Sequence, residues 1–182
     1  MSSRETKPIL ILAGPPGVGK TTAADALAAR SPLAVHLESD AFFRFIHSGY
    51  VPPWKPESHE QNRIVMRIVA GAASSYAAAG YFTVIDGIVI PGWFLEPLRD
   101  ALFEAGQEVA YAVLRAPLSA CVARAQARAR EPLGEPEVVE QLWKSFGDLG
   151  EFEPNALDVR DLSPAGVADQ LERKLQEGLL AI

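Results

Sequence analysis

The chain has 182 residues, of which 48% are hydrophobic and 22% are charged. These values are ordinary for a globular protein, so they argue against disorder and fibrous structure. The 23 acidic residues outnumber the 17 basic residues and give a net charge of −6, which offers no general attraction for nucleic acid. We therefore expect a single domain over residues 1–182 that does not bind nucleic acid.

The first apolar run, Ile9–Ala13, is short and ends where Gly14 and Pro15 interrupt it. It is too short for a membrane span or for the core of a signal peptide, so we expect no membrane partner. The only cysteine is Cys121, so no disulfide can form within the chain, and its apolar helical neighbours indicate a buried packing residue. Together these features predict a cytoplasmic protein.

A glycine-rich octapeptide follows the first apolar run. It reads G-x-x-x-x-G-K-[ST] without a mismatch over Gly14, Pro15, Pro16, Gly17, Val18, Gly19, Lys20 and Thr21. The alternative is a plain glycine-rich turn, but its position between a strand-like run and the helical stretch from Thr22 favours a nucleoside triphosphate site. We predict that the octapeptide and Thr22 bind the nucleotide. Backbone N–H groups would surround the phosphates, Lys20 would reach the β and γ phosphates, and the Thr21 hydroxyl would hold Mg²⁺.

Strand-like runs alternate with helical patterns along the rest of the chain. The strand-like runs are Ile9–Ala13, Val35–Glu38, Phe82–Asp86, Val109–Leu114 and, more weakly, Ala156–Val159. Apolar residues repeat at helical spacing over residues 64–76, 95–102 and 138–146, and Ser163 with Pro164 predicts the start of a last helix. This alternation predicts an α/β fold with a parallel sheet covered by helices on both faces, and ligands at the carboxyl ends of its strands.

Two acidic residues stand at the carboxyl ends of predicted strands. Asp40 follows Val35–Glu38, where a carboxylate could accept a proton from an incoming hydroxyl group, although it could instead cap a helix over Ala41–Ile46. Asp86 ends the next strand and precedes Gly87, so it could face Mg²⁺ or form an Asp-Gly turn. Because strand ends meet at the ligand, we favour catalysis for Asp40 and a metal role for Asp86.

Two arginines, Arg124 and Arg128, lie four residues apart and share one helix face. Like charges at this spacing repel each other unless an anion lies between them, and guanidinium groups stabilise the charge that builds up in phosphoryl transfer. The alternative is a solvated basic face paired with Glu131 and Glu135. We favour a short lid over about residues 124–137, with a hinge in its proline-glycine loop.

Residues 41–63 mix aromatic and polar side chains and form a candidate acceptor-binding segment. Its candidates for the pocket wall are Arg44, His47, Tyr50, Trp54, His59 and Asn62, although packing or surface roles suit most of them equally. Besides Arg44, the segment holds only the basic residues Lys55 and Arg63. Because a phosphorylated acceptor normally needs a basic pocket, this composition favours a neutral or weakly polar acceptor.

With the octapeptide, Asp40, Asp86 and the arginine-bearing arm in place, the chain resembles the small P-loop kinases over nearly its whole length. It is most similar to the group that includes chloramphenicol phosphotransferase and the zeta-toxin-like and gluconate-kinase-like enzymes, often classed as AAA-type ATPase domains. The resemblance implies a three-layer sandwich whose five-stranded parallel sheet has the order 2-3-1-4-5. It also implies ATP as phosphate donor, Mg²⁺, Asp40 as catalytic residue, lid arginines at Arg124 and Arg128, and Arg160 near the adenine.

The leading hypothesis is an ATP-dependent kinase that moves the γ-phosphate to a hydroxyl group of a small metabolite or antibiotic. Lys20 would act in catalysis with Asp40 and the two lid arginines. The protein would be a monomer or a homodimer. One alternative is a nucleoside or nucleotide kinase. Another is a nucleotide-hydrolysing regulatory switch, but Ala156 replaces the lysine of the guanine-reading N-K-x-D motif, so guanine specificity is unsupported.

Overall fold

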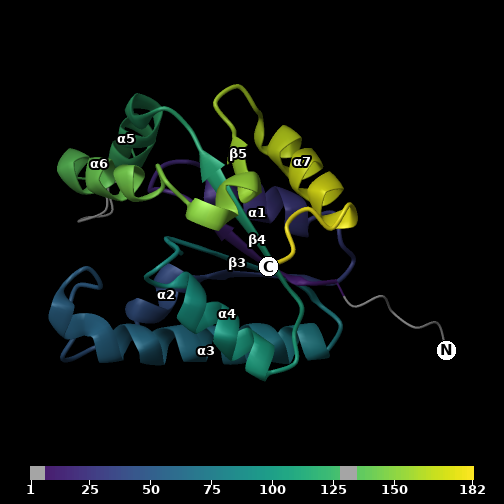
Figure 1. Ribbon diagram of the computed structural model, residues 1–182, viewed down its shortest axis with the longest axis horizontal. Coiled ribbons are helices and arrows are strands. Elements are labelled where there is room, and N and C mark those ends of the chain that lie inside the picture. The colour runs from purple at the N-terminus through teal and green to yellow at the C-terminus, as the bar shows by residue number, and fades with distance from the viewer. Residues whose placement is uncertain (1–6, 128–134) are drawn as a thin grey trace.

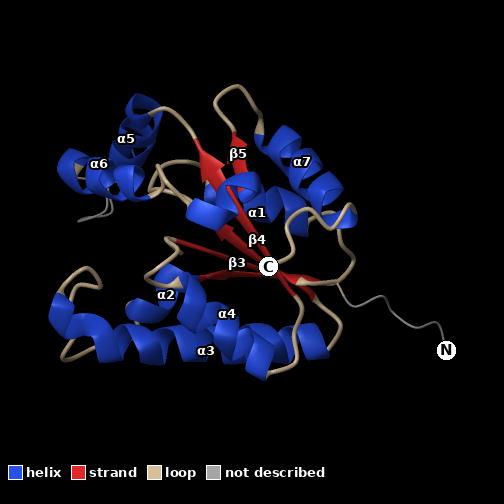
Figure 2. Ribbon diagram, viewed as in Figure 1, coloured by secondary structure: helices blue, strands red, loops and turns tan. Residues whose placement is uncertain are grey.

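A five-stranded parallel sheet forms the centre of the computed structural model, which describes residues 7–127 and 135–182 (Figure 2). Its strands are β1 (Ile9–Ala13), β2 (Ala34–Glu38), β3 (Phe82–Gly87), β4 (Val109–Arg115) and β5 (Ala156–Asp158). The order across the sheet is β2-β3-β1-β4-β5, and all neighbouring strands are parallel. The predicted topology is therefore confirmed.

Helices cover both faces of this sheet (Figure 1). The main helices are α1 (Lys20–Ala28), α3 (His59–Ala78), α4 (Leu95–Glu104), α5 (Leu118–Ala127), α6 (Pro136–Ser145) and α7 (Pro164–Gln176). The shorter ones are α2 (Ser39–Phe43) and the 3-10 helices η1 (Pro56–Ser58) and η2 (Gly150–Asn155). In Figure 1, α3 and α4 lie below the sheet while α1 and α7 lie above it, so the predicted three-layer sandwich is confirmed.

The alternation of side chains along β1 divides the hydrophobic core between the two faces. Ile9 and Ile11 belong to the cluster that includes the apolar residues of α3 and α4. Leu10 and Leu12 belong to the cluster on the other face, with those of α1 and α7. All of β1 is buried, as expected for the central strand of a parallel sheet with helices on both sides.

The parallel direction of β1, β2 and β3 brings the ends of these strands to one edge of the sheet. Asp86, near the end of β3, lies in register with Leu12 of β1 and with Glu38 of β2. The octapeptide follows β1 directly, and Asp40 follows β2 within two residues. The sheet thus delivers three separate sequence segments to one place, where ligands of such folds bind.

Two of the alternatives raised by the sequence are wrong. The helix after β2 is α2, whose capping residue is Glu38, so Asp40 lies in its first turn and does not cap a later helix. Asp86 and Gly87 both belong to β3 and form no turn.

A side chain at Gly87 would place its Cβ 1.9 Å from the Ser39 hydroxyl oxygen, so the glycine allows α2 to start beside β3.

Smaller expectations from the sequence can also be checked. Ser163 caps α7 as predicted, because its hydroxyl oxygen accepts a hydrogen bond from the Gly166 N–H at 3.1 Å. Cys121 is buried in the core as predicted. Within residues 7–127 and 135–182, none of the helices combines the length and the apolar character that crossing a membrane requires.

Candidate active site

The segments after β1, β2 and β3 line one cavity of about 780 Å³. Lys20 of the octapeptide, Asp40 of α2 and Asp86 of β3 all contribute to its wall. A cavity of this size matches those that bind small molecules and cofactors. Residues predicted to act on phosphate, on a hydroxyl group and on a metal therefore surround a single space.

The octapeptide forms the tight turn between β1 and α1. Gly17 has a φ of +75°, and a Cβ there would lie only 2.1 Å from the carbonyl oxygen of Cys121 in α5. No side chain fits at this position, so the glycine lets the loop pack directly against α5. Thr22, the last residue predicted to bind nucleotide, lies exposed in the first turn of α1.

The Lys20 side chain points back into this loop. Its ammonium nitrogen Nζ donates hydrogen bonds to the carbonyl oxygens of Gly14 at 2.9 Å and Pro15 at 3.0 Å. The residue is only 9% exposed, so a buried positive charge stands at the start of α1. Together with the N–H groups at that helix end, this charge suits a polyphosphate.

The residues predicted to hold Mg²⁺ contact each other directly. The Thr21 hydroxyl donates a hydrogen bond of 2.8 Å to Oδ2 of Asp86. Oxygen ligands of this kind suit Mg²⁺, which usually takes one or two protein ligands and completes its shell with phosphate and water. No group of three or more His, Cys, Asp or Glu residues suited to a metal occurs in the described part of the chain.

His36 of β2 is a neighbour of Asp86 that sequence reasoning did not single out for the site. Its Nδ1 lies 2.8 Å from Asp25 Oδ1, and its Nε2 lies 3.3 Å from Asp86 Oδ1. Burial lowers the pKa of His36, but its interactions with the carboxylates of Asp86 and Asp25 outweigh this effect and raise the pKa to about 9. The imidazolium thus braces the Asp86 oxygen that Thr21 leaves uncontacted.

Asp40 is held in an environment that favours its neutral form. Burial raises the pKa of the Asp40 carboxyl above its ordinary value. The nearby positive charge of Lys20 opposes this rise, and the negative charge of Asp86 adds to it. A carboxylate with a raised pKa in a cavity is a better proton acceptor than an exposed one, as a general base requires.

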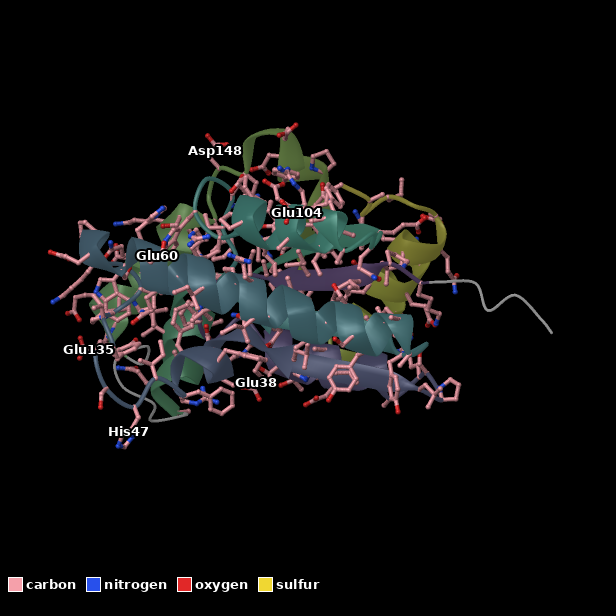
Figure 3. The ribbon with its side chains drawn as sticks, turned by 90° about the horizontal axis from the view of Figure 1, so that it is seen from below. Glu38, His47, Glu60, Glu104, Glu135 and Asp148 are labelled. Atoms are coloured by element: carbon pink, nitrogen blue, oxygen red, sulfur yellow. The ribbon has the colours of Figure 1, made fainter. Side chains whose placement is uncertain are left out.

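Only part of the predicted acceptor segment reaches the cavity. Arg44, Tyr50 and Trp54 line its wall, whereas His47, His59 and Asn62 are not among the described lining residues. Figure 3 shows His47 projecting away from the body of the molecule. Asn62 is instead buried beneath the segment, where it donates a hydrogen bond of 2.8 Å to the Pro53 carbonyl oxygen.

The residues predicted for the lid and the adenine lie outside the cavity wall or outside the described residues. Arg124 lies exposed on α5, which reaches the cavity through Ala125. Arg128 lies outside the described residues. Arg160 follows β5 and pairs with Asp158 through its Nε at 2.8 Å from Oδ2. The roles of these three arginines therefore remain predictions.

Sequence reasoning also missed several residues of the cavity wall. Glu38, Phe43, Ile46, Ile88, Trp93, Phe94 and Leu142 also line the cavity. Most are apolar and read in the sequence as ordinary core residues. A usable signal existed for Trp93, since a tryptophan shortly after the end of a parallel strand lies where ligands bind.

The fold is shared with several solved structures. One is the Deinococcus radiodurans tunicamycin resistance protein, with 23% identity, coverage of 96% of this chain and 98% of that chain, and a TM-score of 0.70. Another is shikimate kinase from Acinetobacter baumannii in complex with shikimate, with 20% identity, 96% coverage of each chain and a TM-score of 0.65. Mycobacterium tuberculosis APS kinase in complex with AMPPNP and APS shares 16% identity, with 94% of this chain and 98% of that chain covered and a TM-score of 0.66. Comparison of the sequence with curated proteins finds no match.

The family comparison agrees with these folds. The sequence profile of the AAA domain family matches residues 9–149, a stretch that runs from β1 through the octapeptide, Asp40 and Asp86 to the end of α6 and beyond. The predicted resemblance to small P-loop kinases is thereby confirmed. Since the match covers well over half of the chain, the protein belongs to the AAA domain family, and it has the fold of small-molecule P-loop kinases.

Proposed function

We propose that this protein transfers the γ-phosphate of ATP to a hydroxyl group of a small molecule. The observation that carries the proposal is that Lys20, Asp40 and Asp86 line the same cavity. A nucleotide-binding module or switch needs Lys20 for the phosphates and Asp86 for the metal. It has no use for a half-buried carboxylate of raised pKa in the wall of that cavity, whereas a kinase does.

The proposed reaction divides the work among these side chains. The acceptor oxygen attacks the γ-phosphorus, the bond to the bridging oxygen of ADP breaks, and the proton of the hydroxyl group passes to the Asp40 carboxylate. Lys20 and the loop N–H groups would hold the phosphates. Thr21 and Asp86 would hold Mg²⁺, which offsets the negative charge of the phosphates when bound. The predicted lid arginines, Arg124 and Arg128, would close over the transferred group.

The names of structural neighbours support the same class of reaction. Shikimate kinase and APS kinase are named as kinases of small molecules, and both share the fold over almost their full lengths. The sequence of the octapeptide adds the phosphate site that such a reaction needs. Neither neighbour fixes the acceptor of this protein.

An ADP-release screen tests the proposal. The wild-type protein with Mg·ATP is assayed against sugars, sugar acids, nucleosides and hydroxylated antibiotics. We expect at least one acceptor to raise ADP release well above the background. The Asp40→Ala variant should lose this increment, by about 100-fold or more, while it still binds ATP.

Asp100→Ala is the matched control, because Asp100 is an exposed carboxylate on α4 that pairs with Arg99. It should keep the full increment. If Asp40→Ala retains acceptor-stimulated transfer, Asp40 is not the base. If ATP is hydrolysed at one rate whatever acceptor is added, the regulatory switch is the better description.

A further inference from the structure

We propose that the acceptor is an uncharged alcohol that carries a flat ring, and that Trp54 and Tyr50 recognise this ring. The inference rests on the proposed function and deepens it by naming the acceptor class. It follows from three features of the cavity: the charges in its wall, its aromatic side chains, and the way the segment that carries Trp54 is fixed.

The charges in the wall disfavour an anionic acceptor. Among the described residues that line the cavity, Glu38, Asp40 and Asp86 are acidic, and Lys20 and Arg44 are basic. Lys20 belongs to the phosphate loop, so Arg44 is the basic lining residue on the acceptor side. A carboxylate or phosphate on the acceptor would meet these acids and the phosphates of ATP together, and like charges at short range repel.

Another basic residue of the acceptor-binding segment already forms an ion pair. Arg63, on α3, lies 2.6 Å from Glu60 through its terminal nitrogen and is not among the described residues of the cavity wall. Guanidinium groups commonly bind carboxylates and phosphates, but Arg44, the one such group in the described wall, shares that wall with the carboxylates of Glu38 and Asp40. The site therefore favours a neutral acceptor.

Several aromatic rings line the cavity, and they come from the segments that follow β2 and β3. Phe94 stacks on Trp93 with ring centres 4.2 Å apart, and Phe43 lies 6.1 Å from Phe94. These rings pack as part of the protein core or directly against it. Tyr50 and Trp54 differ, because each also lines the cavity yet remains 44% exposed. Apolar rings left open at a cavity wall favour a ligand that covers them, and a flat ring does so best.

Trp54 is presented by a segment that is fixed before any ligand binds. The Gln61 side chain donates to the Val51 carbonyl oxygen at 2.6 Å and accepts from the Val51 N–H at 2.9 Å. Ser58 is 1% exposed, and its hydroxyl oxygen lies 2.7 Å from the carbonyl oxygens of both Pro53 and Lys55, which share its one proton.

These bonds run from η1 and the start of α3 to both sides of Trp54. Rigid presentation of an aromatic side chain lowers the entropy lost when a ligand binds. The geometry thus indicates a preformed ring-binding wall.

Calorimetric binding to the full chain, with Mg²⁺ and AMP-PNP present, tests the inference with two matched pairs of probes. Phenyl and methyl β-D-glucoside differ in the ring, and uridine and uridine monophosphate differ in the charge. We expect phenyl glucoside to bind about tenfold tighter than methyl glucoside. Uridine should bind at least about fivefold tighter than its monophosphate.

Variants assign the effect to the proposed wall. Trp54→Ala should reduce the preference for phenyl glucoside to about twofold or less, and Trp54→Phe should keep most of it. Trp143→Phe is the control, because Trp143 lies on α6 with its indole N–H bonded to the Ala116 carbonyl oxygen at 2.8 Å, outside the described cavity wall. It should keep the full preference.

Equal binding of the two glucosides, or the absence of ring-dependent binding up to millimolar concentration, overturns the inference. So does tighter binding of uridine monophosphate, which would point to a nucleotide kinase. These outcomes differ from failure of the proposed function, which is read from ADP release. If a sugar acid best stimulates ADP release, the kinase function stands and the proposed acceptor class is wrong. If ring-bearing molecules bind but nothing stimulates ADP release, ring recognition by the wall stands and the kinase function is wrong.

Discussion

The two ends of the cavity are built in different ways. At the phosphate end, one continuous segment between β1 and α1 supplies backbone groups, Lys20 and Thr21. At the acceptor end, side chains come from the segment after α2, from the segment after β3 and from α6. The phosphate end depends on a backbone geometry that tolerates few substitutions. The acceptor end depends on side chains that can be replaced one at a time.

This difference predicts how each end responds to mutation. Changes at the phosphate end should abolish function for every acceptor, because all acceptors use the same bound nucleotide. Changes at the acceptor end should alter which molecule is used and leave nucleotide binding intact. The following variants test that contrast, in order of decreasing expected effect.

Lys20→Met should give the largest loss. The substitution removes a buried positive charge that would stabilise the phosphates, so we expect acceptor-dependent transfer to fall by about 10³-fold. Steady-state ADP release with saturating acceptor measures it. Lys144→Met, which removes an exposed lysine paired with Glu140 on α6, should retain wild-type turnover. Comparable losses in both variants would mean that the charge at Lys20 has no special role.

Gly17→Ala should destabilise the protein as well as weaken nucleotide binding. The added Cβ meets the Cys121 carbonyl oxygen at 2.1 Å, in a backbone conformation with positive φ, so we expect a loss of about 3 kcal/mol in the free energy of unfolding. Denaturant unfolding and nucleotide titration give the two readings.

Gly106→Ala separates the clash from the backbone strain. Gly106 has nearly the same φ, +72°, but a Cβ there meets nothing within 4 Å. We expect it to cost only about 1 kcal/mol and to leave nucleotide binding unchanged. Equal destabilisation by the two substitutions would show that close packing of the loop against α5 contributes nothing.

The sequence predicted the phosphate end far better than the acceptor end. Strand boundaries and the octapeptide depend on local patterns, and the parallel topology then brings Asp40 and Asp86 to the loop. His36 falls within the predicted strand Val35–Glu38, but its contacts with Asp25 and Asp86 join three separate elements, which no local pattern reveals. Likewise, Asn62 is a candidate pocket residue in the sequence, but in the structure it supports the segment that carries Trp54. The sequence does not distinguish these roles, because no local pattern shows which way a side chain faces.

Asp40→Asn should reduce phosphate transfer but increase the free energy of unfolding at high pH. Because burial raises the pKa of Asp40, the folded protein binds this proton more readily than the unfolded chain does. Wild type therefore loses stability as the pH rises from the pKa of this carboxyl group in the unfolded chain to its raised pKa in the folded protein. We expect the variant to be more stable than wild type near pH 8, and the difference to vanish at low pH, where both side chains are neutral.

Denaturant unfolding across the pH range measures that difference, and ADP release with acceptor measures the accompanying loss of transfer. Asp100→Asn supplies the comparison, since it removes an exposed carboxylate that is not part of the described cavity wall. A stability difference that grows as the pH falls has the wrong sign and would exclude the proposed environment of Asp40.

Gln61→Ala should have the smallest effect, and one confined to the acceptor end. The substitution removes both hydrogen bonds to Val51, so the segment that carries Trp54 loses part of its rigidity. We expect the Kd of phenyl β-D-glucoside to rise about three- to fivefold, with no change in nucleotide affinity, because rigid presentation lowers the entropic cost of binding. Gln61→Glu can still accept from the Val51 N–H but cannot donate, so its Kd should be intermediate. Gln176→Ala, at the exposed end of α7, should match wild type. If Gln61→Ala weakened nucleotide binding as much as glucoside binding, the two ends of the cavity would not be independent, and the contrast between them would fail.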